Sequence, residues 1–381
     1  MFSANLPGCN PPLTRTPIYH FTNYPNPKDF RPIVNAANYR YRALIGTGGI
    51  GSGMFFALDG THTLGREESR SGHFLDRRDY CKLHIVSHYV RRRLGSDFPV
   101  IPLGMVGADE VADRLLGEMA EVGLDTRYVG RAEGRGTLYA LCLIYPDGSG
   151  GNVTENDSAC AAVDAGWIAQ AEPEFARFAG AGIALALPEV PLDARQKLLA
   201  LGTAHGSLRV ASFTSAEIVE LAGRLDEIDL LALNLDEAAA LAGVSAEGSE
   251  PEAVVRAALE RLSPDMWFTV TAGARGSWCW DGAALTHLPI LPVRVEGTAG
   301  AGDAHLAGII AGLAAGLALR EAHQLGVLTA AVAVQSPHTI NFELDREALW
   351  TCAQATGLPL ADAVRTLLAP VELSVGSQAS N

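Results

Sequence analysis

Short apolar runs alternate with longer amphipathic stretches along most of the chain. Runs rich in branched aliphatic residues at 41–48 and 98–107 predict strands, and stretches with apolar residues at helical spacing at 79–95 and 108–123 predict helices. The alternation continues toward the C-terminus, where we expect further strands and a closing pair of helices at 182–188, 207–213, 230–236, 266–273 and 304–335. This rhythm is typical of an α/β protein with a doubly wound, mostly parallel sheet flanked by helices.

One segment departs from this alternation. In it, β-forming residues flank the turn sequence Pro-Asp-Gly-Ser-Gly-Gly, which predicts a β-hairpin. We expect this hairpin, near 135–156, to form a small β lid together with a segment near 50–75. The lid would belong to one main domain at 39–369, between a proline-rich N-terminal extension at 1–38 and a C-terminal tail at 370–381.

Composition excludes several classes of partner. The formal net charge of −14 argues against nucleic acid, because binding to a phosphate backbone depends on clustered Lys and Arg. The cluster Arg91–Arg93 breaks the acidic trend, and we interpret it as a solvated helix end.

The longest apolar stretch, Leu306–Leu319, is too short to span a membrane, and its glycine spacing predicts close helix packing. Six scattered cysteines without a CxxC pair indicate no zinc site and no disulfide scaffold, so we expect a reducing, cytoplasmic setting.

The strongest candidate for chemistry is the run Thr298-Ala-Gly-Ala-Gly-Asp303, which leads into an apolar helix predicted to start near Ala304. A helix N-terminus carries unpaired backbone N–H groups and a partial positive charge, which together hold phosphate or a developing anion. Gly300 and Gly302 let the backbone approach a ligand without interference from a Cβ atom. An acid in the first turn of a helix can also be a capping or dipole-stabilising group, so both interpretations of Asp303 stay open here.

Two further polar turns follow predicted strands. Asn234 and Glu237 come after the apolar run LLAL, and a glycine-rich turn with Thr271, Gly273 and Gly276 follows the run MWFT. Ligands of a doubly wound sheet bind at the carboxyl ends of its strands. These two turns and the run Thr298–Asp303 should therefore converge on one cleft. Taken singly, Asn234 and Glu237 could form a helix capping box, and the glycines could serve an ordinary turn.

Read in order, these segments resemble the ribokinase family of carbohydrate and nucleoside kinases, also called the PfkB family. The resemblance extends from about Tyr41 to about Asp345 and is most specific in the run GTAGAGDAHLAGIIAGL. The runs NLDE, VTAGARG and VIPLGMVGADEVADRLLGEMAEVGLDT and the hairpin after Thr137 support it. The resemblance implies a ribokinase-like fold and an enzyme that moves the γ-phosphate of ATP, or of another nucleotide, onto a hydroxyl of a sugar, a sugar derivative or a nucleoside.

The resemblance also implies roles for the residues of the three turns. Asp303 would be the catalytic base for the acceptor hydroxyl, while backbone amides stabilise charge on the transferred group. Those amides belong to Gly300, Ala301 and Gly302. Asn234 and Glu237 would order Mg²⁺ against the phosphates, with Glu237 as the metal-binding residue. Further nucleotide-binding residues would be Thr271, Gly273, Gly276 and Thr298. The lid would close over the acceptor, and lid strands could pair two subunits in a homodimer.

The acceptor side departs from the family pattern. Ribokinase-like chains usually carry an early Asp for sugar hydroxyls and a Gly-Gly-x-x-x-Asn helix start, and this chain has neither. The segments in their places supply the candidate acceptor-binding residues Gly48, Gly49, Ser52, Arg70, Asp79, Lys82 and His84. They also gather six basic side chains, those of Arg66, Arg70, Arg77, Arg78, Lys82 and His84. One hypothesis is that some of these hold an anionic group of the acceptor. The alternative is that they pair on a solvated surface with the acids Glu67, Glu68, Asp76 and Asp79.

Two other classes of function stay open. The turn Gly46–Gly51 fits the dinucleotide motif GxGxxG, with Glu67 at a suitable distance downstream, and would suggest an oxidoreductase. That motif requires a long helix from Gly51, whereas Asp59–Gly60 breaks the pattern after only MFFAL. A non-catalytic ligand sensor that keeps the kinase fold is the other alternative, because a fold alone does not guarantee chemistry.

Overall fold

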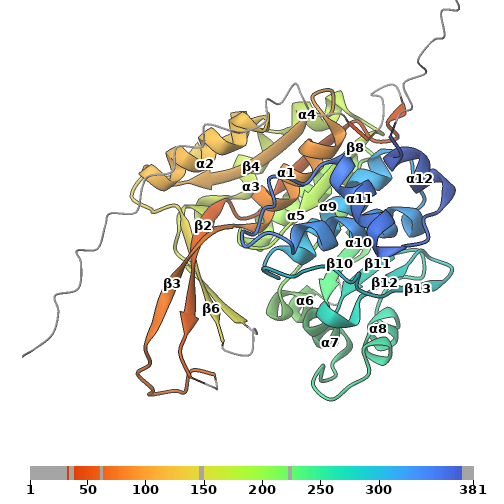
Figure 1. Ribbon diagram of the computed structural model, residues 1–381. Coiled ribbons are helices and arrows are strands. Elements are labelled where there is room, and N and C mark those ends of the chain that lie inside the picture. Colours follow the sequence, from red (N-terminus) through yellow and green to blue (C-terminus); the bar gives the residue numbers. More distant parts are fainter. Residues whose placement is uncertain (1–31, 34–37, 61–62, 146–149, 222–224, 371–381) are drawn as a thin grey trace, which may run out of the picture.

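The computed structural model describes residues 32–33, 38–60, 63–145, 150–221 and 225–370. The expected N-terminal extension and C-terminal tail lie almost entirely outside these ranges, as does the turn of the predicted hairpin at 146–149. Within the described ranges, the chain forms a large sheet flanked by helices and a smaller sheet that projects from one side (Figure 1).

The large sheet has nine strands in the order β13-β12-β11-β10-β9-β8-β1-β4-β5. These are β1 (Ala43–Thr47), β4 (Val100–Val106), β5 (Val129–Arg131), β8 (Gly182–Ala186), β9 (Leu208–Ala211), β10 (Leu230–Asn234), β11 (Trp267–Thr271), β12 (Ser277–Trp280) and β13 (Leu285–Leu288). From β11 to β5 neighbouring strands run parallel, and β12 and β13 join antiparallel. Strands β1 and β8 are buried at every position, as apolar strands covered on both faces must be. The predicted doubly wound, mostly parallel sheet is confirmed.

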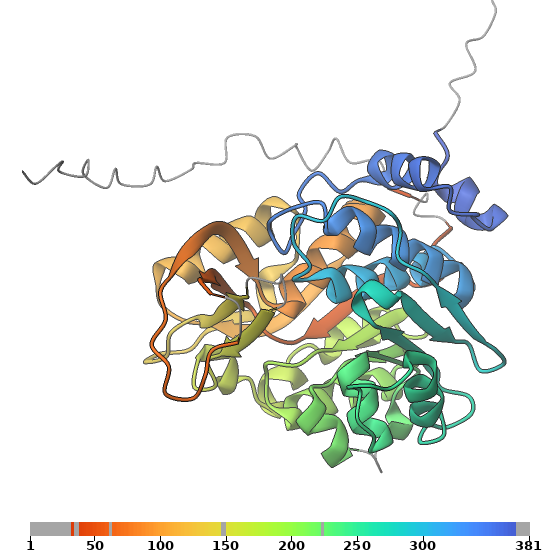
Figure 2. The same ribbon diagram turned by 60° about the horizontal axis from the view of Figure 1, so that its bottom comes forward.

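Helices cover both faces of this sheet (Figure 2). One layer contains α1 (Lys82–Leu94), α2 (Glu110–Glu121), α9 (Ala301–Ala314), α10 (Leu319–Ala333), α11 (Arg346–Thr356) and α12 (Asp362–Leu368). The other contains α3 (Ala165–Ala169), α4 (Glu172–Arg177), α5 (Leu192–Ala204), α6 (Ser215–Leu221), α7 (Leu235–Ala242) and α8 (Pro251–Leu259). Each layer buries its own apolar core against the sheet, so the sheet edge between the layers stays available for polar residues.

The smaller sheet has four strands in the order β3-β2-β6-β7, and we call it the lid sheet. Its members are β2 (Gly51–Leu58), β3 (Gly72–Tyr80), β6 (Leu138–Ile144) and β7 (Gly150–Thr154). Strands β6 and β7 pair antiparallel, as in the predicted hairpin. Strand β3 continues to Tyr80, where a helix was expected, because Asp79 and Tyr80 pair with Gly53 and Ser52. The GxGxxG turn therefore leads into strand β2 and not into a helix, which argues against the dinucleotide-binding alternative.

Helices α9 and α10 pack closely through glycines. A Cβ atom on Gly308 would lie 2.7 Å from both the Gly326 Cα atom and the Leu325 carbonyl oxygen, and one on Gly312 would lie 2.8 Å from the Ala322 Cβ atom. The two helices can approach this closely because these positions carry no side chain. The glycine spacing thus correctly predicted close helix packing. No helix among the described residues is both long enough and apolar enough to cross a membrane.

The interpretation of Arg91–Arg93 as a solvated helix end is wrong. Arg92 and Arg93 are 6% and 2% exposed, because α1 is covered along its length by α9 and neighbouring segments. Nη2 of Arg92 donates to the Phe342 carbonyl oxygen (2.9 Å), and Nη1 of Arg91 donates to the Gly95 carbonyl oxygen (2.9 Å). Burial lowers the pKa of Arg93 to about 9. Sequence periodicity did not reveal that this end of α1 lies inside the molecule.

Gly308→Ala is expected to lower the free energy of unfolding by about 1–3 kcal/mol, since the added methyl group would overlap backbone atoms of α10. The matched control is Gly117→Ala, which lies inside α2, where a Cβ atom would meet nothing within 4 Å. The control should gain roughly 0.5–1 kcal/mol from helix propensity. Urea unfolding followed by circular dichroism measures both, and a Gly308→Ala protein as stable as the parent would contradict the close packing of α9 and α10.

Candidate active site

Helix α9 begins inside the glycine-rich run. Gly300 is its N-cap and has a φ of 78°, a left-handed conformation that glycine adopts without steric cost. The helix starts at Ala301, earlier than the predicted Ala304, and Asp303 lies in its first turn. The Ala301 amide donates to the Thr298 carbonyl oxygen (3.2 Å), which closes the turn. The predicted helix N-terminus is therefore present, with the acid at its first turn.

The end of β11 lies beside this helix start. A Cβ atom on Gly302 would be 3.7 Å from Oγ1 of Thr271, the last residue of β11. Gly273 and Gly276 shape the tight turn that follows, with φ values of 53° and 84°, and the Ala272 amide donates to the Gly276 carbonyl oxygen (2.9 Å). The turn itself requires these glycines, and their contact with a nucleotide stays a prediction.

The turn after β10 forms a capping box on α7. Oδ1 of Asn234 accepts a hydrogen bond from the Glu237 amide, and Oε2 of Glu237 accepts one from the Asn234 amide, each at 2.8 Å. Burial raises the pKa of the Glu237 carboxyl, and the charge of Asp303 adds to this, whereas the charge of Lys82 opposes it. Glu237 is therefore within electrostatic reach of both residues. Its structural role does not exclude cation binding, because the capping box uses one of its two carboxylate oxygens.

An ion pair joins the N-termini of α1 and α9. Nζ of Lys82, the first residue of α1, lies 3.6 Å from Oδ1 of Asp303. The Asp303 charge raises the pKa of Lys82, outweighing the opposing effect of burial, so the ammonium group stays charged at neutral pH. The structure thus brings together Asp303 and Lys82, which the sequence placed in separate groups of candidates.

Glu189 joins this cluster, and the sequence analysis missed it. Oε2 of Glu189 accepts a hydrogen bond from the Lys82 amide (3.4 Å), and a Cβ atom on Gly49 would lie 2.7 Å from the Glu189 Cβ atom. Burial raises the pKa of Glu189 to about 7, against the opposing charge of Lys82 and with a further contribution from Asp303. Glu189 follows β8 at the carboxyl edge of the sheet. The rule that drew attention to the turns after β10 and β11 would have found it.

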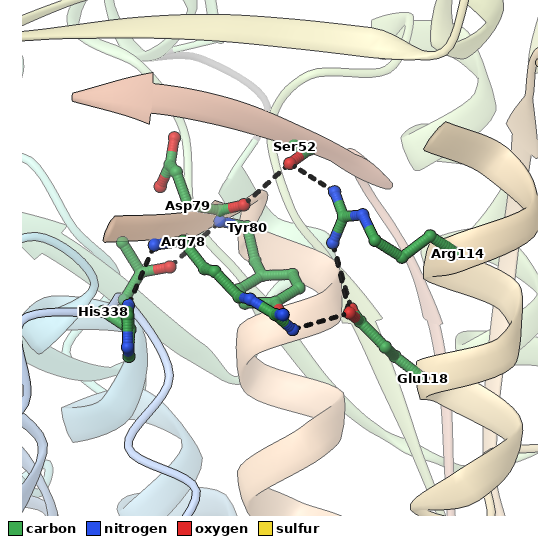
Figure 3. Close-up of polar contacts among 8 residues, drawn as sticks. Ser52, Arg78, Asp79, Tyr80, Arg114, Glu118 and His338 are labelled. Carbon is green, nitrogen blue, oxygen red and sulfur yellow. Dashed lines mark hydrogen bonds and ion pairs between the residues drawn. The ribbon is translucent and has the colours of Figure 1, made fainter. Parts of the chain in front are cut away.

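Asp79 reaches the same cluster from the end of β3. It is buried, and Sγ of Cys142 donates to its Oδ2 at 3.5 Å. Burial raises the pKa of Asp79 to about 6, and the charge of Asp303 contributes in the same direction. A Cβ atom on Gly53 would collide with Oδ2 of Asp79, so the glycine leaves the space that this carboxyl occupies. Ser52 supports the strand end, because its Oγ donates to the Asp79 carbonyl oxygen (3.2 Å; Figure 3).

The structure does not bring all predicted acceptor-binding residues together. Arg70 lies in the connection between β2 and β3, where Nη2 pairs with Oε1 of Glu68 at 2.6 Å. His84 is 1% exposed, and burial lowers its pKa to about 3. Its imidazole is therefore neutral and cannot be one of the cations that hold an anionic acceptor. Gly48 is needed for close packing, since a Cβ atom there would lie 2.8 Å from the Leu187 Cβ atom.

Comparison with known proteins identifies relatives. The sequence pattern of the pfkB family carbohydrate kinases matches residues 90–346. The fructoselysine 6-kinase of Shigella flexneri is 42% identical over 66 residues, which are 17% of this chain and 25% of that protein, so the chain matches a quarter of that relative's length.

The fold also resembles solved structures. A ribokinase from Cryptococcus neoformans in complex with ADP superposes with a TM-score of 0.66 and 20% identity, over 83% of this chain and 99% of that one. An Arabidopsis thaliana ribokinase complexed with ribose and ATP superposes with a TM-score of 0.62 and 18% identity, over 82% and 98% of the two chains. At these identities the likeness establishes a shared fold.

The buried neutral His84 predicts a loss of stability in acid. Unfolded histidine binds a proton below a pH of about 6.5, whereas folded His84 resists protonation down to about pH 3, so stability falls as the pH drops through this window. In His84→Phe, the loss of unfolding free energy between pH 7.5 and pH 5 should be about 2 kcal/mol smaller than in the parent. His73→Phe, at an exposed position of β3, serves as the control and should leave the pH dependence unchanged. Urea unfolding at the two pH values gives the free energy of unfolding at each. An equal loss between pH 7.5 and pH 5 in the parent and in His84→Phe would contradict the burial of His84.

Proposed function

Because the chain belongs to the pfkB family of carbohydrate kinases, we propose that it transfers the γ-phosphate of ATP to a hydroxyl group of a sugar, a sugar derivative or a nucleoside. The observation that carries this proposal is the position of Asp303, in the first turn of a glycine-capped helix and paired with Lys82. A carboxylate beside a helix N-terminus places a proton acceptor next to a site for a developing anion.

Asp303 would act as the catalytic base. Its carboxylate would accept the proton of the acceptor hydroxyl as the hydroxyl oxygen attacks the γ-phosphorus and the bond to the β-phosphate oxygen breaks. The ammonium group of Lys82, 3.6 Å from Oδ1, would hold the carboxylate in place for this step. Because phosphoryl transfer is governed by positioning and electrostatics, a fixed base beside the anion site can supply much of the required catalysis.

The start of α9 would bind the transferred phosphoryl group. The amides of Gly300 and Gly302 lie at the positive end of the helix dipole, where anions are stabilised. The Ala301 amide would join them after releasing the Thr298 carbonyl oxygen. The other nucleotide-binding residues of the proposal are Asn234, Thr271, Gly273, Gly276 and Thr298. The short distance between Gly302 and Thr271 supports a shared donor site.

A magnesium ion would accompany ATP on the side of Glu237. The residues fit this ion, because the Glu237 carboxyl is half-buried within electrostatic reach of Asp303, and a divalent cation would offset the repulsion that contributes to its raised pKa. Within the described ranges no cluster of three or more His, Cys, Asp or Glu side chains is preformed for a metal. Mg²⁺ needs none, since it commonly binds through one or two carboxylates together with phosphate oxygens. When bound, it would neutralise charge on the phosphates.

Asp79 and Glu189 would bind the acceptor, with Gly48, Gly49 and Ser52 shaping the adjoining backbone. Carboxylates accept hydrogen bonds from hydroxyl groups, so this pair favours a polyhydroxylated acceptor. Two of the basic residues considered for an anionic acceptor do not support it. His84 is neutral, and Arg70 forms an ion pair with Glu68. The names of the relatives, a fructoselysine kinase and ribokinases, also point to sugars and sugar conjugates.

Asp303→Asn tests the catalytic base, because the amide keeps the shape of the side chain and cannot take the proton. Turnover of ATP in the presence of sugars, polyols and nucleosides should fall roughly 10²–10⁴-fold, while ADP affinity by calorimetry stays near the parental value. Asp362→Asn, an exposed acid in the first turn of α12, is the matched control and should be fully active.

Unchanged turnover in Asp303→Asn would remove Asp303 as the base. A parent protein that binds ATP and a sugar without transferring phosphate would instead favour the ligand-sensor alternative.

We also propose a homodimer formed through the outer face of the lid sheet. Phe74 on β3 and Val153 on β7 are 59% and 63% exposed. The Phe74 ring packs edge-on against Phe56, with ring centroids 4.9 Å apart. Large apolar side chains gathered on an exposed face usually pack against a partner.

Phe74→Glu should convert the dimer into monomers in sedimentation velocity, because a charge would be buried at the interface. Val244→Glu introduces the same charge at an exposed apolar position outside the lid and should leave the dimer intact. A monomeric parent protein at micromolar concentration would contradict the proposed assembly.

A further inference from the structure

Two residues of the segment between α10 and α11 bind the end of β3. The amide of Thr339 donates to the Arg78 carbonyl oxygen (3.1 Å), and Oγ1 of Thr339 accepts from the Tyr80 amide (2.9 Å). Nδ1 of His338 accepts from the Arg78 amide (2.9 Å). Figure 3 shows His338 beside the Arg78 backbone, with a dashed line between them. We call this set of hydrogen bonds the 338–339 latch.

The other side of the latch contacts the start of α9. A Cβ atom on Gly300 would lie 2.7 Å from the Thr339 carbonyl oxygen and 3.2 Å from the Thr339 Cβ atom, and one on Gly297 would lie 3.2 Å from the Ser336 carbonyl oxygen. The glycine-rich loop therefore rests directly on the backbone around Thr339. Because Gly300 is the N-cap of α9, any movement of Thr339 would change the direction of the amides that follow it.

The end of β3 is itself anchored to α2. Nη1 of Arg78 lies 3.2 Å from Oε1 of Glu118, and Nη1 of Arg114 donates to the same oxygen at 3.2 Å. Nη2 of Arg114 donates to Oγ of Ser52 (2.8 Å), which connects the network to β2 (Figure 3). Exposed ion pairs contribute little, but Glu118 is only 8% exposed and bridges two guanidinium groups. The start of β2 and the end of β3 are thus both bound to α2.

We propose that Thr339 is a positioning residue that aligns the anion-binding amides of α9 with the acceptor side of the site. Asp79, a proposed acceptor ligand, lies between Arg78 and Tyr80, the two residues that the latch binds. One short piece of β3 therefore carries the Asp79 carboxyl as a side chain and binds Thr339 through its backbone, and the α9 loop rests on Thr339. This inference rests on the proposed kinase function and adds a residue that does not touch the reacting atoms.

The test replaces Thr339 by valine, which keeps the shape and removes the hydrogen-bond acceptor of the Tyr80 amide. With misaligned amides, kcat should fall roughly ten- to hundredfold, while the Kd of ADP changes less than about threefold. Thr339→Ser keeps the hydroxyl and should restore kcat. Thr366→Val, which removes a hydroxyl bonded to the Asp362 carbonyl oxygen in the distant helix α12, is the matched control.

A second readout requires no turnover. ADP with aluminium fluoride mimics the transferred phosphoryl group, so the parent should bind it at least about tenfold more tightly than ADP alone, and Thr339→Val should lose this gain while keeping its ADP affinity. Glu118→Gln should show a weaker loss that is not additive with Thr339→Val, since both act through β3.

The outcomes separate the two proposals. If the parent shows the gain and Thr339→Val retains both the gain and kcat, Thr339 positions nothing and this inference is wrong. If the parent shows neither phosphoryl transfer nor any gain with aluminium fluoride, the proposed kinase function fails. A parallel loss of ADP affinity and of kcat in Thr339→Val and Thr339→Ser would indicate a general structural role and would also overturn the inference.

Discussion

The ion pair between Lys82 and Asp303 holds together carboxyl groups that would otherwise repel one another. It joins the first residue of α1 to the first turn of α9, so two helix N-termini, each with a partial positive charge, meet at one point. Glu189 and Glu237 lie near the same ammonium group, and burial raises the pKa of both. The cluster holds more acids than cations, which fits the proposal that a nucleotide with its Mg²⁺ supplies the remaining positive charge.

Much of the fold, and the position of the turns assigned to the proposed donor side, could be predicted from the sequence because both depend on local patterns. Apolar runs separated by amphipathic stretches specify strands and helices, and a parallel sheet then forces the ends of β10 and β11 to the same edge. The glycine-rich start of α9 could be located for the same reason, since helix N-termini have a local signature. Glu189 could have been found with this rule as well, because it follows β8 at that edge.

The residues of the proposed acceptor side could be named from the sequence only in part, and their contacts could not be predicted, because these depend on pairing between distant segments. Asp79 enters the cluster because β3 runs beside β2 as far as Tyr80, and nothing in the local sequence distinguishes this strand end from the start of α1. The burial of Arg93 and His84 has the same origin, since helical periodicity shows which residues share a face but not whether a second layer covers the opposite face. Basic side chains that the sequence pattern assigned to the surface are therefore buried in the structure.

The bonds between β3 and the segment at 338–339 connect residues 259 and 260 positions apart in the chain. At roughly 5–20 residues per second, the ribosome needs on the order of tens of seconds to make the intervening polypeptide. During that time the end of β3 lacks the partners of these backbone groups. The contact between β3 and the α9 loop can therefore form only after Thr339 has been made, and a product that terminates before Thr339 lacks the proposed positioning residue.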